Sequence, residues 1–185
     1  MAQHTFAETK GEFDETLGYI RGDLDWLIKN KPNLHYTVAL LVGCGCEVLA
    51  ACRGHRKRGE IVFAELLPPG DWQVLATRLY GALRDGLAHG FDTKHILVDG
   101  IEHQICLNST AQTQLQFSDS NRGIILSVEI KSIAAALCAK ITDFENLLKQ
   151  DSDVRERFMK AHQRPAELSQ DEATAWRNLV KTARL

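Results

Sequence analysis

Hydrophobic side chains recur every three or four residues over most of this chain, as they do on one face of an α-helix. Pro32 follows the first such stretch, where helices usually end, and Asp71 is a suitable N-cap for the third. The fourth stretch is the most regular, since its six apolar positions are separated by three or four residues throughout. The pattern predicts helices over residues 11–30, 35–53, 72–89 and 130–148.

Between the third and the fourth of these helices the hydrophobic period changes to two residues, which is typical of strands. Asp99 and Gly100 separate two short apolar stretches and predict a tight hairpin turn. A second turn is predicted over residues 119–123. The pattern therefore predicts a small antiparallel β-hairpin or meander, inserted around residues 95–128. Its expected strands are 96–98, 101–107, 115–117 and 124–128.

The C-terminal part of the chain is organised differently from the rest. Apolar spacing around position 158 indicates a short helix that ends before Pro165. Ser169 and Glu172 have the spacing of a capping box, which predicts a further helix after them. The sequence thus predicts a mainly α protein, with a helical bundle and its β insertion in residues 1–163 and a C-terminal helical extension in residues 164–185.

Composition limits the classes of function that the chain can have. Its 185 residues are 44% hydrophobic and 25% charged, as in a globular domain with its own apolar core. The formal net charge of −2 excludes a uniformly basic surface. Any role in binding nucleic acid must therefore rest on local groups of cations.

Cysteine usage and the lengths of the apolar runs predict a location. The cysteines are odd in number, with five in the chain, and none forms a C-x-x-C pair, so a disulfide framework is not expected. The N-terminal residues lack the apolar segment of a signal peptide. Uninterrupted apolar runs are far shorter than the roughly 20 residues that a membrane span needs. We therefore expect a cytoplasmic protein with no membrane association.

One stretch of the sequence carries candidate chemistry. Residues 80–93 read Tyr-Gly-Ala-Leu-Arg-Asp-Gly-Leu-Ala-His-Gly-Phe-Asp-Thr, so Arg84 and Asp85 are followed by His89 late in a predicted helix. This combination resembles the HEPN family of small helical proteins, whose motif is an arginine, a polar residue, several others and a histidine. The order of predicted helices is similar over residues 11–148, whereas the detailed likeness is confined to the motif and its neighbours.

The resemblance implies a metal-independent endoribonuclease or an RNA-binding relative, working as a homodimer and often in stress response or phage defence. His89 would give general acid–base catalysis while a ribose 2′-hydroxyl attacks the adjacent phosphate. Arg84 would bind that phosphate, and Asp85 would orient a partner side chain or the substrate. Imidazole titrates near neutral pH and guanidinium forks onto phosphate oxygens, which suits these roles. Phe91 stands where some family toxins carry a tyrosine that is modified, so we do not expect that regulation.

The spacing within the motif limits how it can work. Arg84 and His89 are five residues apart, which is about 140° around an ideal helix. They can share one cleft if the helix ends or distorts near residues 86–90, or if a partner subunit completes the site. Arg157 and His162 repeat the same spacing. The residue after that arginine is a predicted core phenylalanine, so we do not favour the second pair.

A structural role for the same residues is the alternative. Arg84 can pair with an adjacent element, and His89 can be an ordinary residue at a helix end. Glu47 lies in an otherwise apolar helix, where a carboxylate needs a partner, and Arg84 is a cation expected to supply it. On this alternative the chain is a non-catalytic dimeric helical interaction or regulatory module, which binds a partner protein.

Two further features complete the expectations. A dense basic run either contacts RNA phosphates or forms a solvated loop; it comprises Arg53, Arg56, Lys57 and Arg58. The sequence contains no H-E-x-x-H, no paired C-x-x-C and no glycine-rich phosphate-binding loop, so we expect no metal and no cofactor. Trp26, Trp72 and Trp176 fall at helical spacing with other apolar residues, which predicts that they pack in the core.

Overall fold

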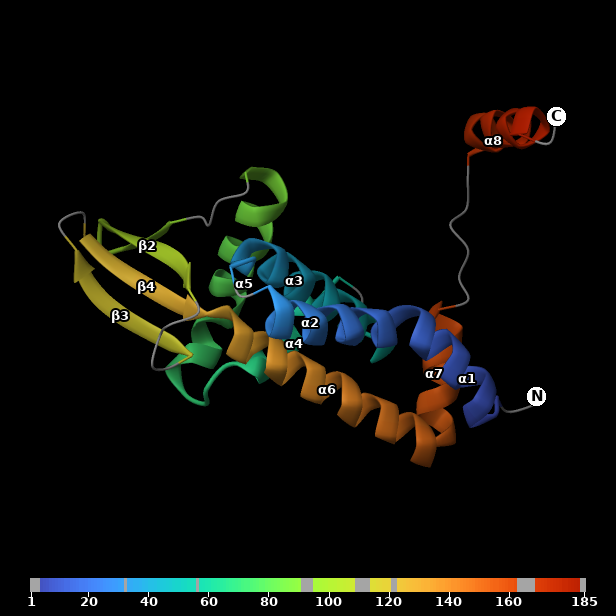
Figure 1. Ribbon diagram of the computed structural model, residues 1–185, viewed down its shortest axis with the longest axis horizontal. Helices are drawn as coiled ribbons and strands as arrows, with labels where there is room; N and C mark the ends of the chain where they lie inside the picture. Colours follow the sequence, from blue (N-terminus) through green and yellow to red (C-terminus); the bar gives the residue numbers. More distant parts are fainter. Residues whose placement is uncertain are drawn as a thin grey trace.

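The computed structural model of the chain is mainly helical, with one small sheet at an end of the helical bundle (Figure 1). It describes residues 4–31, 33–55, 57–90, 95–108, 114–120, 123–162 and 169–183. Within these ranges only the backbone is described for residues 87–90, 108, 120, 162, 178–179 and 181–183.

The N-terminal helical segment begins earlier than the sequence predicts. Thr5 caps it in a complete capping box with Glu8, so the helix starts at residue 6 rather than 11. A wide π-helical turn lies in its middle, where the prediction had one uniform helix. Leu17, inside that turn, and Leu24, in the α-helix that follows it, are both fully buried. The three parts are α1 (Phe6–Phe13), η1 (Asp14–Gly18) and α2 (Tyr19–Asn30).

The centre of the bundle is α3 (His35–Cys52), which contacts α2, α4, α5 and α6. By length and composition this helix is apolar enough to cross a membrane, and it is the one such helix among the described residues. Half of its apolar window is buried by neighbouring helices, and the core helix of a globular protein passes the same test. Residues Gly59–Leu66, which follow the basic run and for which the sequence pattern predicted no element, form a short helix. The helices around α3 are α4 (Gly59–Leu66), α5 (Asp71–Gly90), α6 (Ile130–Gln150) and α7 (Ser152–His162).

The regular helix predicted near the C-terminal end of the bundle is confirmed. Every one of its six predicted stripe positions in α6 is buried, from Ile130 to Leu148. Glu129 caps the helix, because its carboxylate accepts the Ser132 backbone N–H at 2.6 Å. The stripe of α6 faces α2 and α3, and at its far end Phe144 meets Phe158 of α7 edge to face.

The predicted strands are confirmed, but the prediction of a purely antiparallel insertion is wrong. The strand order is β1-β2-β4-β3, and the two hairpins β1-β2 and β3-β4 are antiparallel. The second strands of the two hairpins pair with each other, so β2 and β4 run parallel and the sheet is mixed. Local turn residues specify each hairpin but not which strands of the two hairpins meet. The strands are β1 (Ile96–Val98), β2 (Ile101–Asn108), β3 (Leu115–Ser120) and β4 (Gly123–Glu129).

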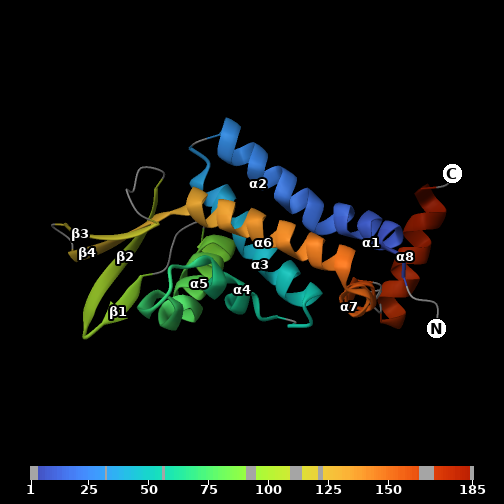
Figure 2. The same ribbon diagram turned by 90° about the horizontal axis from the view of Figure 1, so that it is seen from below.

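The last helix, α8 (Gln170–Ala183), begins with the predicted capping box. The Ser169 backbone N–H donates to the Glu172 carboxylate at 2.8 Å, and the Glu172 N–H donates back to the Ser169 hydroxyl. Figure 1 shows α8 apart from the other helices, while Figure 2 shows the sheet at the opposite end of the molecule from α7. The predicted division between residues 163 and 164 falls outside the described residues.

Candidate functional site

The motif residues belong to α5, one of the helices packed against α3. This helix begins at Asp71, directly after a glycine with a positive φ, and continues as an α-helix to Gly90. Arg84 and Asp85 are both described. The backbone of His89 belongs to the last turn of α5, but its side chain lies outside the described residues.

Arg84 lies between two carboxylates. Its Nε is 3.6 Å from Oε1 of Glu47 on α3, and its Nη1 donates to Oδ1 of Asp85 at 3.2 Å. The pairing with Glu47 confirms the expectation from the sequence that this carboxylate has a cationic partner. The Arg84 side chain is 49% exposed. Its Nη2 has no hydrogen-bond partner among the described residues, so the guanidinium can still donate to a ligand.

Tyr80 supports this group of charges from the buried side of α5. Its hydroxyl lies 3.0 Å from Oε1 of Glu47 and 3.2 Å from the carbonyl oxygen of Gly43, and it donates its proton to one of them. Burial, and then the negative charge of Glu47, raise the pKa of Tyr80 far above its usual range. The phenol therefore stays a neutral donor that fixes Glu47, which in turn fixes Arg84.

Close backbone approach makes this arrangement possible. Gly59, at the start of α4, lies so near Tyr80 that a Cβ there would overlap the phenol oxygen. Gly43 of α3 faces Arg84, and a Cβ there would be 3.9 Å from the arginine Cβ, an ordinary contact. Of these two glycines, Gly59 is thus the one that the site requires.

The uninterrupted course of α5 bears on how the motif could act. The sequence left two ways for positions 84 and 89 to share a cleft, and the first was an end or a distortion of the helix near residues 86–90. The helix ends at Gly90, directly after His89, but both positions lie inside it and are about 140° apart around its axis. The backbone of α5 alone therefore does not bring the two positions to one side of the helix.

The basic run was predicted either to contact RNA or to form a solvated loop, and its first residue, Arg53, is engaged within the protein. Both oxygens of Glu65 accept from Arg53 at 3.0 Å, and Lys140 lies 3.2 Å from the same carboxylate. Burial opposes ionisation of Glu65, but the hydrogen bond and charge of Arg53, together with Lys140, lower its pKa.

The rest of the basic run is exposed. Arg58 pairs with Glu60 at 3.2 Å, and Lys57 is exposed with a φ of 55°. Arg56 lies outside the described residues. No contact among the described residues joins the run to Arg84 or Asp85. The structure therefore does not bring the two predicted groups of site residues together.

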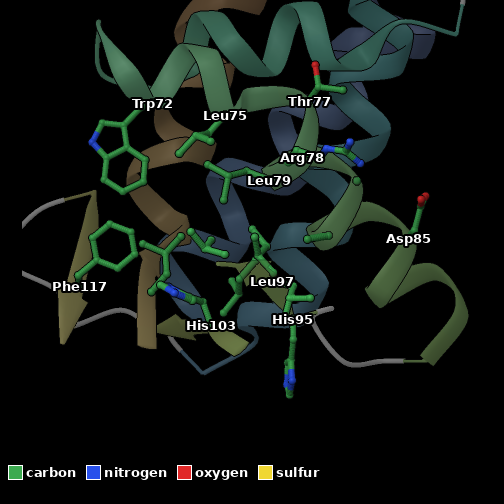
Figure 3. Close-up of a pocket in the computed structure, with 16 residues that line it drawn as sticks. Trp72, Leu75, Thr77, Arg78, Leu79, Asp85, His95, Leu97, His103 and Phe117 are labelled. Atoms are coloured by element: carbon green, nitrogen blue, oxygen red, sulfur yellow. The ribbon is translucent and has the colours of Figure 1, made fainter. Parts of the chain in front are cut away.

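A groove that sequence reasoning missed lies between α5 and the sheet. It has a volume of about 630 Å³, and Asp85 lies at its rim (Figure 3). Trp72 of α5 stacks on Phe117 of β3, with ring centroids 5.5 Å apart and planes 24° from parallel. His103 of β2 meets the same phenylalanine edge on, at 6.5 Å. Asp85 is shared by the groove and the candidate site, because it lines the groove and accepts a hydrogen bond from Arg84.

The tryptophans differ from their prediction as core residues. Trp72 is only half-buried and lines the groove, while Trp26 and Trp176 are 54% and 63% exposed. Helical spacing shows that an apolar residue shares a face with others. It does not show whether another element covers that part of the face.

Metal ligands and buried thiols do not mark a second site in the part of the chain that is described. No three His, Cys, Asp or Glu side chains gather there in a way that could hold a metal ion. Burial is the main reason that the pKa of the Cys46 thiol is raised, and it raises the pKa of Cys52 to about 12. These buried thiols are therefore poor nucleophiles.

Comparisons with known proteins do not identify the chain. No family model matches it, and no similar protein was found among curated proteins or among solved structures.

Proposed function

We propose that this protein is an HEPN-like, metal-independent endoribonuclease, or an RNA-binding relative of one, that acts as a homodimer. The resemblance of the motif suggests the class. The observation that supports it best is the setting of Arg84, whose guanidinium is half-exposed, held by Glu47 and Asp85, and left with a free donor among the described residues. A cation positioned in this way is suited to bind a phosphate, which accepts the forked guanidinium donors.

The proposed reaction needs no metal. His89 in its neutral form takes the proton of a ribose 2′-hydroxyl, and the resulting oxygen attacks the adjacent phosphorus. The bond from phosphorus to the 5′-oxygen breaks, leaving a 2′,3′-cyclic phosphate on one product. An imidazolium returns a proton to the departing 5′-oxygen. Arg84 stabilises the negative charge that develops on the phosphate, and Asp85 with Glu47 holds the guanidinium in place.

The geometry of α5 supports the proposal of a dimer. Because α5 is continuous through both positions, the backbone positions of residues 84 and 89 in one chain lie about 140° apart around the helix axis. A two-fold arrangement can bring the Arg84 of one protomer to the His89 of its partner. We place the protein in the cytoplasm and, following the resemblance, in stress response or phage defence.

One observation favours the alternative of a non-catalytic interaction or regulatory module that binds a partner protein. Arg84 already has two carboxylate partners in its own chain, and such pairing is complete without any ligand. On this alternative the contacts of Glu47 with Tyr80 and Arg84 only hold α5 against α3. The two functions predict different results for a variant in which Arg84 is replaced but α5 still packs against α3.

The decisive experiment measures cleavage of single-stranded and structured RNA by the purified protein in the presence of EDTA. Arg84→Gln and His89→Ala should each lower the rate by about 100-fold or more. RNA with 2′-O-methyl riboses should remain intact because the attacking hydroxyl is blocked. Arg157→Gln is the matched control, because it alters the arginine of the other Arg–His pair with this spacing, and it should cleave normally.

A double variant separates chemistry from packing. Glu47→Gln together with Arg84→Gln removes both charges, so thermal stability should return close to that of the wild type while cleavage stays lost. If the double variant instead regains cleavage, or if no version of the protein cleaves any RNA, the endoribonuclease proposal fails. In the second case the interaction module becomes the better account.

A further inference from the structure

The groove between α5 and the sheet is open to solvent although its walls are largely apolar. Leu75 and Leu79 form the wall on α5, and the sheet contributes Leu97 and Ile105. Leu97 is 72% exposed, and Phe117 at the end of the groove is 53% exposed. Burial of such exposed apolar side chains by a flat apolar ligand is favourable. The volume of the groove is that of a small-molecule or nucleotide site.

The aromatic pair at one end of the groove is suited to a nucleobase. Trp72 and Phe117 already stack nearly parallel, so their planes are aligned across the mouth of the groove. Unpaired bases stack on such side chains in proteins that bind single-stranded nucleic acid, with little dependence on sequence. An aromatic pair between a helix and an adjacent strand thus provides a preformed platform.

The charges that line the groove favour an anionic ligand over an apolar peptide. Arg78 is exposed, lines the groove, and has no carboxylate partner among the described residues. His103 also lines it, and its one described interaction is the edge contact with Phe117. Asp85 lies at the rim, but Arg84 pairs with it. Arg78 can therefore bind a phosphate beside a base that lies on the aromatic pair.

The groove and the candidate site meet at Asp85 but lie on different sides of α5. Trp72 and Arg84 are twelve residues apart on the same helix, which is about 18 Å along its axis and about 120° around it. Asp85 belongs to both, since it lines the groove and binds Arg84. A single strand that contacts both the aromatic pair and Arg84 must therefore pass around α5 at Asp85.

We infer that this groove is a binding site for an unpaired base of single-stranded RNA, in which the base stacks on the Trp72–Phe117 pair and Arg78 binds a neighbouring phosphate. The inference rests on the proposed function, because it identifies the RNA as single-stranded beside the reacting phosphate. It also gives a role to an apolar surface that the residues described at the sheet end leave uncovered.

Fluorescence of Trp72 tests the inference without any need for cleavage. Trp26→Phe and Trp176→Phe together leave Trp72 as the only tryptophan, and both replaced side chains are exposed. Titration with a single-stranded 2′-O-methyl RNA, which cannot be cleaved, should quench Trp72 with saturation. Phe117→Leu in this background should weaken binding by about fivefold to 100-fold because one stacking surface is lost. Tyr36→Leu, at an exposed aromatic of α3, is the control and should bind as before.

Salt dependence tests the role of Arg78. The slope of log affinity against log salt concentration should become smaller by about one for Arg78→Gln. Lys160→Gln, which changes an exposed cation on α7 at the other end of the molecule, should keep the full slope.

The outcomes separate this inference from the proposed function. Cleavage of RNA without quenching of Trp72, or with unchanged affinity in Phe117→Leu, overturns the groove site and leaves the endoribonuclease. Quenching that Phe117→Leu weakens, without cleavage by any version, supports the groove site and overturns the endoribonuclease. Quenching by an apolar peptide but not by RNA overturns the inference, and absence of both binding and cleavage overturns both proposals.

Discussion

The two ends of the molecule contain charged clusters that are built in opposite ways. At the end formed by α1, α2, α6 and α7, one buried carboxylate is surrounded by cations. Arg21 donates to Glu145 at 2.9 Å, and the Nζ atoms of Lys10 and Lys149 each lie 3.8 Å from its other oxygen. The ring of Phe13 lies beneath two of these cations, so the cluster closes directly over the apolar core.

At the sheet end the arrangement is reversed. One half-exposed cation, Arg84, lies between the carboxylates of Glu47 and Asp85, beside an open groove rather than over a closed core. The comparison shows that ion pairs alone do not reveal function. The first cluster surrounds its buried charge on several sides, whereas the second presents a positioned charge to solvent. Only the second can accept a ligand without repacking the core.

The largest expected difference between the two ends is in packing. Phe144→Ala should lower the free energy of unfolding by about 3–5 kcal/mol, because a fully enclosed ring is replaced by a cavity. Phe117→Ala removes a ring of the same type from the groove and should cost no more than about 1.5 kcal/mol. Urea unfolding of both variants beside the wild type gives the comparison. Equal losses would show that the sheet end is as tightly packed as the other end.

The next difference concerns the carboxylates. Glu145→Gln should cost about 1–3 kcal/mol, since a buried acceptor loses its charge while three cations remain around it. Glu47→Gln should cost within about 1 kcal/mol, because the amide oxygen still accepts from Tyr80 and Arg84 is free to turn to water. Thermal unfolding of the two variants at low and high salt measures this. A larger loss for Glu47→Gln would mean that Arg84 has a mainly structural role.

Much of the helical part of the fold could be predicted from the sequence. Helical periodicity is local, so the stripe of α6 could be recognised before its partners were known. The Glu47–Arg84 pair was predictable for another reason, because a lone carboxylate in an apolar helix requires a nearby cation. Both predictions follow from rules that hold within one helix or for one buried group.

What the sequence did not indicate depends on which elements meet. The turn at Asp99 and Gly100 specifies one hairpin, but the parallel pairing of β2 with β4 joins residues from two hairpins. The groove was missed for the same reason, since Trp72 has the spacing of a core residue and only the position of the sheet leaves it half-covered. The role of Gly59 depends likewise on Tyr80, which is distant in sequence.

The smallest expected effect concerns a third charged cluster, in which Arg53 and Lys140 surround Glu65 as cations surround Glu145, but near the surface. Because these cations lower the pKa of Glu65 in the folded state, its ionised form stabilises the protein above the unfolded carboxyl pKa of 4.5. That contribution should disappear as the pH falls through the lower folded pKa. Glu65 is 37% exposed, so we expect at most about 1 kcal/mol.

Urea unfolding of wild type and Glu65→Gln between about pH 3 and about pH 7 tests this expectation, because titration of all other groups cancels in the difference. The difference should be constant near neutral pH and shrink toward zero in acid. Glu15→Gln, at an exposed residue of η1 with no ion pair among the described residues, should show no such trend. A difference that stays constant down to the lowest pH would mean that Arg53 does not hold Glu65 in solution. Arg53 would then be free to bind RNA phosphates, and the basic run would join Arg84 as a candidate contact.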